Sequence, residues 1–106
     1  MRDLRIVFMG TPEFAVASLD KLIKAKKNVV GVITAPDRPA GRGRQLKQSA
    51  VKQHAVAHNI PVLQPTNLKD PHFLEELRSL NANLQVVVAF RMLPEAVWKM
   101  PQYGTF

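Results

Sequence analysis

The sequence predicts an α/β fold, an open and mostly parallel twisted sheet with helices on both faces. Short apolar, β-rich runs alternate along the chain with amphipathic stretches that begin at helix-capping signals. The runs at 4–9 and 84–90 are almost continuously apolar, which is typical of strands covered on both faces. Because parallel strands joined through helices cross over with a right hand, this alternation predicts a doubly wound sheet.

The first strand and the first helix are expected within residues 4–26. The run LRIVFM (residues 4–9) is apolar and rich in β-formers. In the GTPEF segment that follows, Gly10 permits a tight turn, Thr11 is a candidate N-cap and Pro12 suits the first helical position. A helix through about Lys26 is therefore expected. Its inward face is expected to carry Phe14, Leu19, Leu22 and Ile23.

The second strand, the next helix and a short third strand are expected between residues 28 and 65. The run NVVGVIT predicts a strand at 28–34. Ser49 is a candidate N-cap for a helix over about 50–58. The segment PVLQP predicts a short strand within 61–65.

Two further helices and two further strands are expected in the last part of the chain. Asp70 and Pro71 are an N-cap and first-position pair that opens a helix. One face of that helix is expected to carry Leu74, Leu77 and Leu80. The last expected elements are a strand at 84–90, a short helix at 94–100 and the start of a fifth strand at 103–106.

Composition indicates a soluble globular chain. The 106 residues can bury a core without disulfides, and the apolar fraction of 46% argues against disorder. There is no cysteine, which excludes disulfides and thiolate metal sites. No apolar run approaches the roughly 20 residues of a membrane span, and no leader pattern opens the chain. A cytoplasmic location without membrane contact is therefore expected.

A cluster of cations lies between the second strand and the next helix, in TAPDRPAGRGRQLKQSAVK (residues 34–52). This segment carries five cations and one anion, a net +4 in a chain whose formal net charge is +7. Two prolines and two glycines in its first half predict irregular backbone there. The clustering favours an anionic partner, for which phosphate is the commonest choice.

Three interpretations of this basic loop stay open on the residues alone. A solvated polar loop is the common role of a charge run, and a small phosphorylated substrate would need fewer, converging charges. Contact with an RNA or DNA backbone explains both the number of cations and the preference for arginine. Aromatic residues total only 7%, which disfavours single-strand binding by base stacking and leaves contact with a duplex stem.

Several nucleotide and hydrolase motifs are missing. The turn after the first strand has Gly10, but Pro12 stands where a dinucleotide-binding fingerprint needs its second glycine. This disfavours a nicotinamide or flavin cofactor. The chain also has no Walker A loop and no G-x-S-x-G nucleophile elbow. The GTPEF turn is either a plain helix start or a helix N-terminus that receives an anion or polar ligand.

Two histidines have a spacing that can ligate zinc. His54 and His58 are four residues apart on a predicted helix. Residue 55 is alanine where H-E-x-x-H needs glutamate, and the sequence indicates no third ligand. A partly exposed helix face is therefore favoured over a metal site. His72, in the first turn of a later helix, has no such partner.

The segment AFRMLP follows the expected strand at 84–90. There Phe90, Arg91, Met92 and Leu93 turn irregularly at the carboxyl edge of the sheet. Apolar side chains beside exposed backbone amides can hold a flat heteroaromatic ring. A hydrophobic loop that packs on the next helix is the other interpretation, and the residues alone favour it.

Four segments of the chain together resemble the N-terminal part of the methionyl-tRNA formyltransferases. They are RIVFMGTPEFAVASLDKLI, VVGVITAPDRPAGRGRQL, PVLQPTNL and VVVAFRMLPEAVWKMPQYGTF, in this order. The resemblance covers essentially the whole chain, and GTPEF with PDRPAGRG is its most specific part. One departure is AFRMLP, where many members of that family read Tyr-Gly and one residue more.

The resemblance implies a Rossmann-like formyltransferase fold. Residues 1–106 would form the N-terminal portion of its catalytic domain, with the rest of that domain and a C-terminal β-barrel beyond them. The family transfers the formyl group of 10-formyltetrahydrofolate to the amino group of methionyl-initiator tRNA, for translation initiation. The expected partners are therefore initiator methionyl-tRNA and the folate co-substrate, with no metal. The full-length protein is expected to be a monomer.

The site residues that the resemblance implies fall into three groups. The tRNA contacts are Arg42 foremost, with Arg38, Arg44 and Lys47 as further phosphate contacts. The folate pocket is implied to involve Phe90, Arg91, Met92, Leu93 and Val97. The cleft for the methionyl end of the tRNA is implied to be bordered by Gly10, Thr11, Pro12 and Phe14.

The family's catalytic residues are an asparagine, a histidine two positions later and a downstream aspartate. The asparagine is expected directly after Phe106, so no residue of 1–106 is assigned as catalytic, and these residues alone are expected to be inactive. Two alternatives remain. A folate-dependent formyltransferase for a small amine or sugar nucleotide is disfavoured by the basic PDRPAGRG loop. A non-catalytic RNA- or DNA-binding module leaves AFRMLP unexplained.

Overall fold

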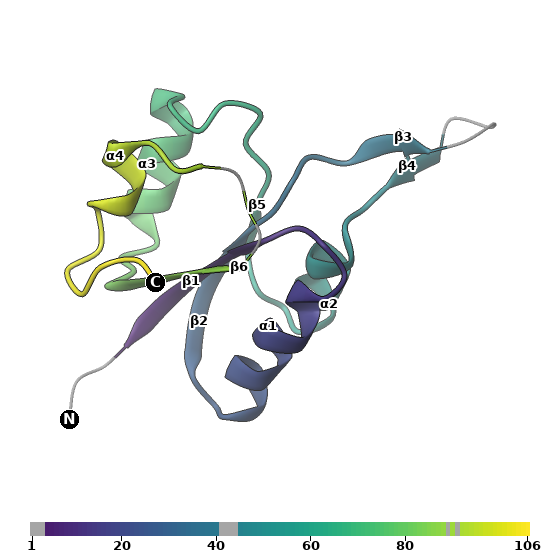
Figure 1. Cartoon of the computed structure of the whole chain (residues 1–106), viewed down its shortest axis with the longest axis horizontal. Helices are drawn as coiled ribbons and strands as arrows, with labels where there is room; N and C mark the ends of the chain where they lie inside the picture. Colours follow the sequence, from purple (N-terminus) through teal and green to yellow (C-terminus); the bar gives the residue numbers. More distant parts are fainter. Residues whose placement is uncertain (1–3, 41–44, 89, 91) are drawn as a thin grey trace.

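The computed structural model describes residues 4–40, 45–88, 90 and 92–106, and for residues 38–40 and 45–47 it describes the backbone alone. Helices and strands alternate as expected, except that two unexpected short strands lie between the second strand and the next helix (Figure 1). In chain order they are β1 (Arg5–Gly10), α1 (Ala15–Lys24), β2 (Asn28–Ile33), β3 (Arg38–Ala40), β4 (Gln45–Lys47), α2 (Ala50–Ala57), β5 (Val62–Leu63), α3 (Pro71–Ser79), β6 (Leu84–Val88) and α4 (Glu95–Trp98).

Four of these strands form a parallel sheet in the order β5-β2-β1-β6. The chain builds outward from β1 through β2 to β5, then returns to add β6 on the other side of β1. The strand order therefore reverses between β1 and β6, which makes this pair the topological switch point. The predicted open parallel sheet with helices on both faces is confirmed.

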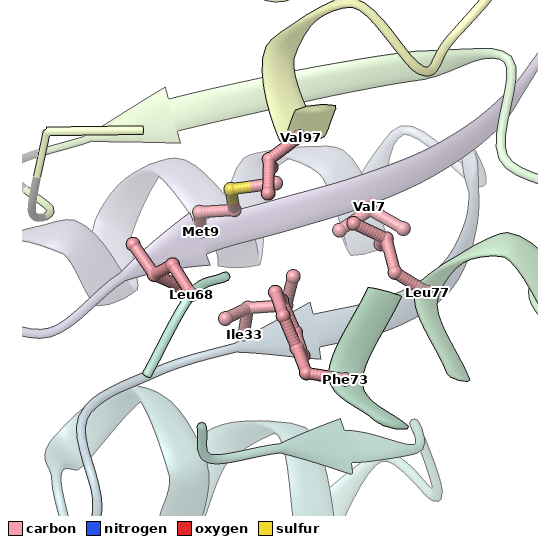
Figure 2. Packing of buried hydrophobic residues seen from close by; sticks show 7 residues of the cluster. All are labelled: Val7, Met9, Ile33, Leu68, Phe73, Leu77 and Val97. Atoms are coloured by element: carbon pink, nitrogen blue, oxygen red, sulfur yellow. The ribbon is translucent and has the colours of Figure 1, made fainter. Parts of the chain in front are cut away.

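Each face of the sheet has its own hydrophobic core. Side chains alternate along β1, so Phe8 packs on one face with α1 and α2, while Val7 and Met9 pack on the other with α3 and α4. Figure 2 shows this second core, where Val97 of α4 points toward Met9. Both cores contain fully buried, closely packed side chains. The sheet is therefore a rigid support for the loops at its ends.

Helix α3 and its C-cap residue pack the expected leucines, Leu74, Leu77 and Leu80, against the core, and the helix also buries Phe73, which was not expected. Asp70 caps it as predicted, accepting a hydrogen bond from the His72 backbone at 3.1 Å. The buried residues are Phe73 and Leu77, four apart and therefore on one face, whereas Leu74 is only partly buried. Phe73 was missed because a leucine repeat at 74, 77 and 80 gives the same helical period.

The expectation of irregular backbone in the first half of the basic loop holds for residues 34–37 and was wrong for residues 38–40. Strands β3 and β4 pair antiparallel, with Arg38 opposite Lys47, Pro39 opposite Leu46 and Ala40 opposite Gln45. A proline is tolerated here because a two-stranded ribbon has outer edges on which no N–H is needed. Figure 1 shows this β3–β4 hairpin extending away from the four-stranded sheet.

The end of the chain runs beside β6, as expected for the start of a further strand. Thr105 forms an isolated parallel bridge with Gln85. The Gln85 backbone donates to the Gly104 carbonyl at 3.1 Å, and the Phe106 backbone donates to the Gln85 carbonyl at 2.9 Å. The outer edge of β6 is thus partly covered by residues 104–106.

Candidate functional site

The carboxyl ends of the four parallel strands meet at one edge of the sheet, at Gly10, Ile33, Leu63 and Val88. In open α/β sheets, ligands bind beyond this edge and close to the switch point. The GTPEF turn follows β1 at this edge, residues 34–37 lead from β2 into the β3–β4 hairpin, and the chain continues from β6 toward α4. This edge is therefore the candidate functional site.

Gly10 allows the ends of β1 and β6 to approach closely. A Cβ atom on this residue would lie 2.8 Å from the carbonyl oxygen of Val88 and 3.0 Å from the Cβ of Ala15. The first of these is backbone and cannot rotate away. Close packing at the switch point thus accounts for the glycine without any approach to a pyrophosphate.

Thr11 does not cap the first helix, contrary to expectation. Helix α1 begins at Ala15, its N-cap position is Phe14, and no side chain caps it. Instead the Thr11 hydroxyl accepts a hydrogen bond from the Ala35 backbone at 3.2 Å. The GTPEF turn is thereby attached to the segment that leads into the hairpin.

The expectation that Phe14 faces inward was also wrong. Its side chain is 67% exposed, because the helix starts after it and the residue belongs to the preceding turn. The backbone carbonyls of Pro12 and Glu13 accept from Ala15 and Val16 in that turn, at 3.0 Å each. An exposed aromatic ring beside the carboxyl edge is available to a ligand.

A pocket of about 340 Å³ lies between the GTPEF turn and the two ends of the hairpin. Among the four residues expected at the methionyl-end cleft, Thr11 contributes to its lining, and Gly10, Pro12 and Phe14 do not. The lining residues are Thr11, Glu13, Ala35, Pro36, Gln48, Ser49 and Ala50. No local pattern indicates that residues 48–50 contribute, because they reach this pocket only when the β3–β4 hairpin folds back.

The two chain segments at the base of the hairpin, residues 34–37 and 48–52, are called here the hairpin root. Asp37 joins them: its Oδ2 accepts from Lys52 Nζ at 2.8 Å, and its Oδ1 accepts from Gln64 Nε2 at 2.7 Å. Gln64 also lies 3.1 Å from the Ala35 carbonyl oxygen, to which its Nε2 donates. The side chains of Asp37 and Lys52 are only 20% and 17% exposed. One carboxylate thus ties the hairpin root to α2 and to the end of β5.

Ser49 holds the same root from the other side. Its hydroxyl caps α2, as predicted, by accepting from the Lys52 backbone at 3.0 Å. It also lies 2.8 Å from the hydroxyl of Thr34, which is fully buried. Both ends of the hairpin therefore leave the sheet from positions set by several hydrogen bonds.

The hydrogen bond from Lys52, together with that from Gln64, holds the pKa of Asp37 below its ordinary value. A lowered pKa in the folded state means stability that is present above the unfolded pKa of about 3.9 and is lost as the pH falls through the folded value. We expect Asp37→Asn to be less stable than the wild type near neutral pH, and this difference to shrink as the pH falls below about 4. Urea unfolding at a series of pH values measures it. A difference that stays constant with pH would contradict the role of the carboxylate charge.

The predicted tRNA-contacting residues lie on the hairpin, as far as the structure describes them. Arg38 and Lys47 are opposite each other at its base, and only their backbone is described. Arg42 and Arg44 lie outside the described residues. Lys52, one of the five cations in the segment, is paired with Asp37, which makes it less available to a partner.

The residues expected at the folate pocket differ in their surroundings. Phe90 and Leu93 are partly buried against the core shared with α3 and α4, and Met92 is 94% exposed. Val97 is fully buried in that core (Figure 2), so it offers no surface to a ligand in this arrangement and would support the pocket from behind. Arg91 lies outside the described residues. The pterin contacts remain a prediction.

Comparison with known proteins agrees with the resemblance to formyltransferases that the sequence indicated. The family model for formyl transferases matches residues 4–106, and the chain belongs to the formyl transferase family. A methionyl-tRNA formyltransferase of Flavobacterium johnsoniae is 67% identical over 106 residues, which are 100% of this chain and 34% of that protein. One of Parabacteroides distasonis is 67% identical over 105 residues, covering 98% of this chain and 32% of that protein. One of Bacteroides thetaiotaomicron is 61% identical over 104 residues, with 98% and 32% covered.

The chain thus spans about a third of the length of the curated relatives it matches. The part described here contains the switch point, the hairpin root and the pocket between them. None of the helices in the described residues has the length and apolar character needed to cross a lipid bilayer.

Proposed function

We propose that this chain is the N-terminal portion of the catalytic domain of a methionyl-tRNA formyltransferase. The full-length enzyme transfers the formyl group of 10-formyltetrahydrofolate to the amino group of methionyl-initiator tRNA, in the cytoplasm and as a monomer. The observation that carries the proposal is the 67% identity over all 106 residues to a relative of that name. The catalytic asparagine, histidine and aspartate are proposed to follow residue 106.

The geometry supports a different role for each of the segments at the carboxyl edge of the sheet. Strands β3 and β4 extend away from the sheet (Figure 1). The sequence between and within them contains Arg38, Arg42, Arg44 and Lys47, which are proposed to contact phosphates near the acceptor end of the tRNA. The pocket beside Thr11 is proposed to receive the methionyl end. The segment at 90–93 is proposed to contact the pterin, and the reacting groups then meet at the switch point between β1 and β6.

The test is formyl transfer by the full-length protein. With 10-formyltetrahydrofolate, we expect formylation of initiator methionyl-tRNA and no formylation of free amines or of an amino-sugar nucleotide. Residues 1–106 alone are expected to give no turnover, since the catalytic groups are proposed to lie beyond them. If the protein formylated a small amine and did not formylate initiator methionyl-tRNA, the alternative of a small-substrate formyltransferase would replace this proposal.

A further inference from the structure

Three side chains that can ligate a metal meet at the outer edge of the contact between α1 and α2. They are Asp20 of α1, His54 of α2 and His58, the residue that directly follows α2, and their ligand atoms all lie within 4.8 Å of one another. The sequence indicated only the histidine pair, because Asp20 is 34 residues before His54 and comes beside it only through helix packing. The structure thus places beside the histidine pair a third side chain that could ligate a metal, which the sequence did not indicate.

The helices hold these groups in place through the core beneath them. Leu19, next to Asp20, and Ala55, next to His54, are both fully buried in the core that α1 and α2 share with the sheet. Because these neighbours cannot shift without opening that core, the backbone positions of Asp20 and His54 are fixed. The side chains themselves reach solvent, with His54 and Asp20 only 22% and 26% exposed and His58 more open.

The hydrogen bonds of the three groups orient them for a metal. His54 Nε2 lies 3.0 Å from Asp20 Oδ1. His58 Nδ1 lies 2.8 Å from the His54 carbonyl oxygen, which can only accept, so Nδ1 carries the proton and the neutral ring keeps a lone pair on Nε2. A backbone carbonyl on one ring nitrogen is the usual partner of a metal-ligating histidine.

Asp20 is prepared to act as the anionic ligand. Its Oδ2 is paired with Lys24 at 2.8 Å, which leaves Oδ1 for the histidine side. Among the described residues, Asp20, His54 and His58 form the one group of three or more histidine, aspartate or glutamate side chains close enough to share a metal ion.

We propose that Asp20, His54 and His58 bind a divalent transition-metal ion, with Zn²⁺ as the best match. Two imidazole nitrogens and one carboxylate oxygen suit zinc, which takes three protein ligands and a water in many sites. Ligands at about 2.0–2.1 Å from a tetrahedral ion are separated by roughly 3.3 Å. The Asp20 Oδ1–His54 Nε2 distance of 3.0 Å is close to that separation. The exposed His58 ring, whose ligand atom lies within 4.8 Å of the other two, has to move closer to become the third ligand. The ion would clamp α1 to the helix whose first turn holds the hairpin root.

The test is the binding of Zn²⁺ alone to the full-length protein, measured by titration calorimetry and by thermal unfolding. We expect a site whose occupation raises the unfolding temperature, because a ligand of the folded state stabilises it. His58→Ala and Asp20→Asn are each expected to lower the Zn²⁺ affinity by at least about tenfold. Removing even a residue that only hydrogen-bonds a metal ligand lowers metal affinity by that factor. Co²⁺ in place of Zn²⁺ should give the visible absorption of a tetrahedral ion, and His58→Ala should remove it.

The matched control is His72→Ala, which removes an exposed histidine from α3 on the opposite face of the sheet. It should leave Zn²⁺ affinity and the Co²⁺ spectrum unchanged. Because His58 is exposed, its variant is expected to fold, and circular dichroism without metal checks this. Zn²⁺ binding that His58→Ala and Asp20→Asn leave intact, or no Zn²⁺-dependent rise in the unfolding temperature of the wild type, would overturn the proposal.

Discussion

Lys52→Met in the full-length protein is expected to raise the KM for methionyl-tRNA by about ten- to a hundredfold, the size of effect that a displacement of about 1 Å produces at a reacting centre. The substitution removes the cation 2.8 Å from Asp37 and leaves a carboxylate that is four-fifths covered without its ionic partner. The hairpin root then loses the link between Asp37 and α2. Steady-state kinetics with varied tRNA measures the effect, and the KM for the folate should change little.

Two further variants separate this positioning role from direct contact between Lys52 and RNA. Lys21→Met removes an exposed lysine of α1 and serves as the charge-matched control. The double variant Asp37→Asn with Lys52→Met leaves no unpaired charge and should recover part of the loss. If Lys52 contacted a phosphate instead, the double variant would recover nothing and the salt dependence of KM would weaken.

Arg42→Ala is expected to raise the KM for tRNA and to leave the stability of the protein unchanged. One lost phosphate contact should reduce the slope of log affinity against log salt by about 0.7–0.9. Losing a hydrogen bond between charged groups, worth about 1.5–3 kcal/mol, corresponds to a rise in KM of about tenfold or more. Measuring KM at several salt concentrations gives both quantities.

The control for Arg42→Ala is Lys27→Ala. Lys27 is an exposed cation that directly precedes β2, so it lies at the amino edge of the sheet and away from the hairpin. Its removal lowers the net charge by the same amount and should leave the salt slope unchanged. Equal effects of the two substitutions would mean that tRNA responds to the overall charge of the protein, and the assignment of Arg42 would fail.

Local signals predicted the elements whose formation depends on neighbouring residues. Ser49 and Asp70 cap α2 and α3 as expected, since a cap joins atoms two or three residues apart. The apolar runs predicted β1, β2 and β6 to within a few residues, because strands covered on both faces need apolar side chains at nearly every position. The start of α1 was predicted too early because Thr11 and Pro12 resemble a helix start. The Thr11 hydroxyl instead accepts a hydrogen bond from the backbone of Ala35, which is far along the chain.

The sequence by itself therefore determined the parallel α/β architecture, the position of the basic segment at the carboxyl edge and the resemblance to the formyltransferases. The tertiary structure decided how that segment is held. Thr11 meets Ala35 across 24 residues, Asp37 meets Gln64 across 27, and Asp20 meets His54 across 34. Polar side chains such as these carry no period along the chain, and their partners are chosen only when the sheet and its helices have brought distant segments together.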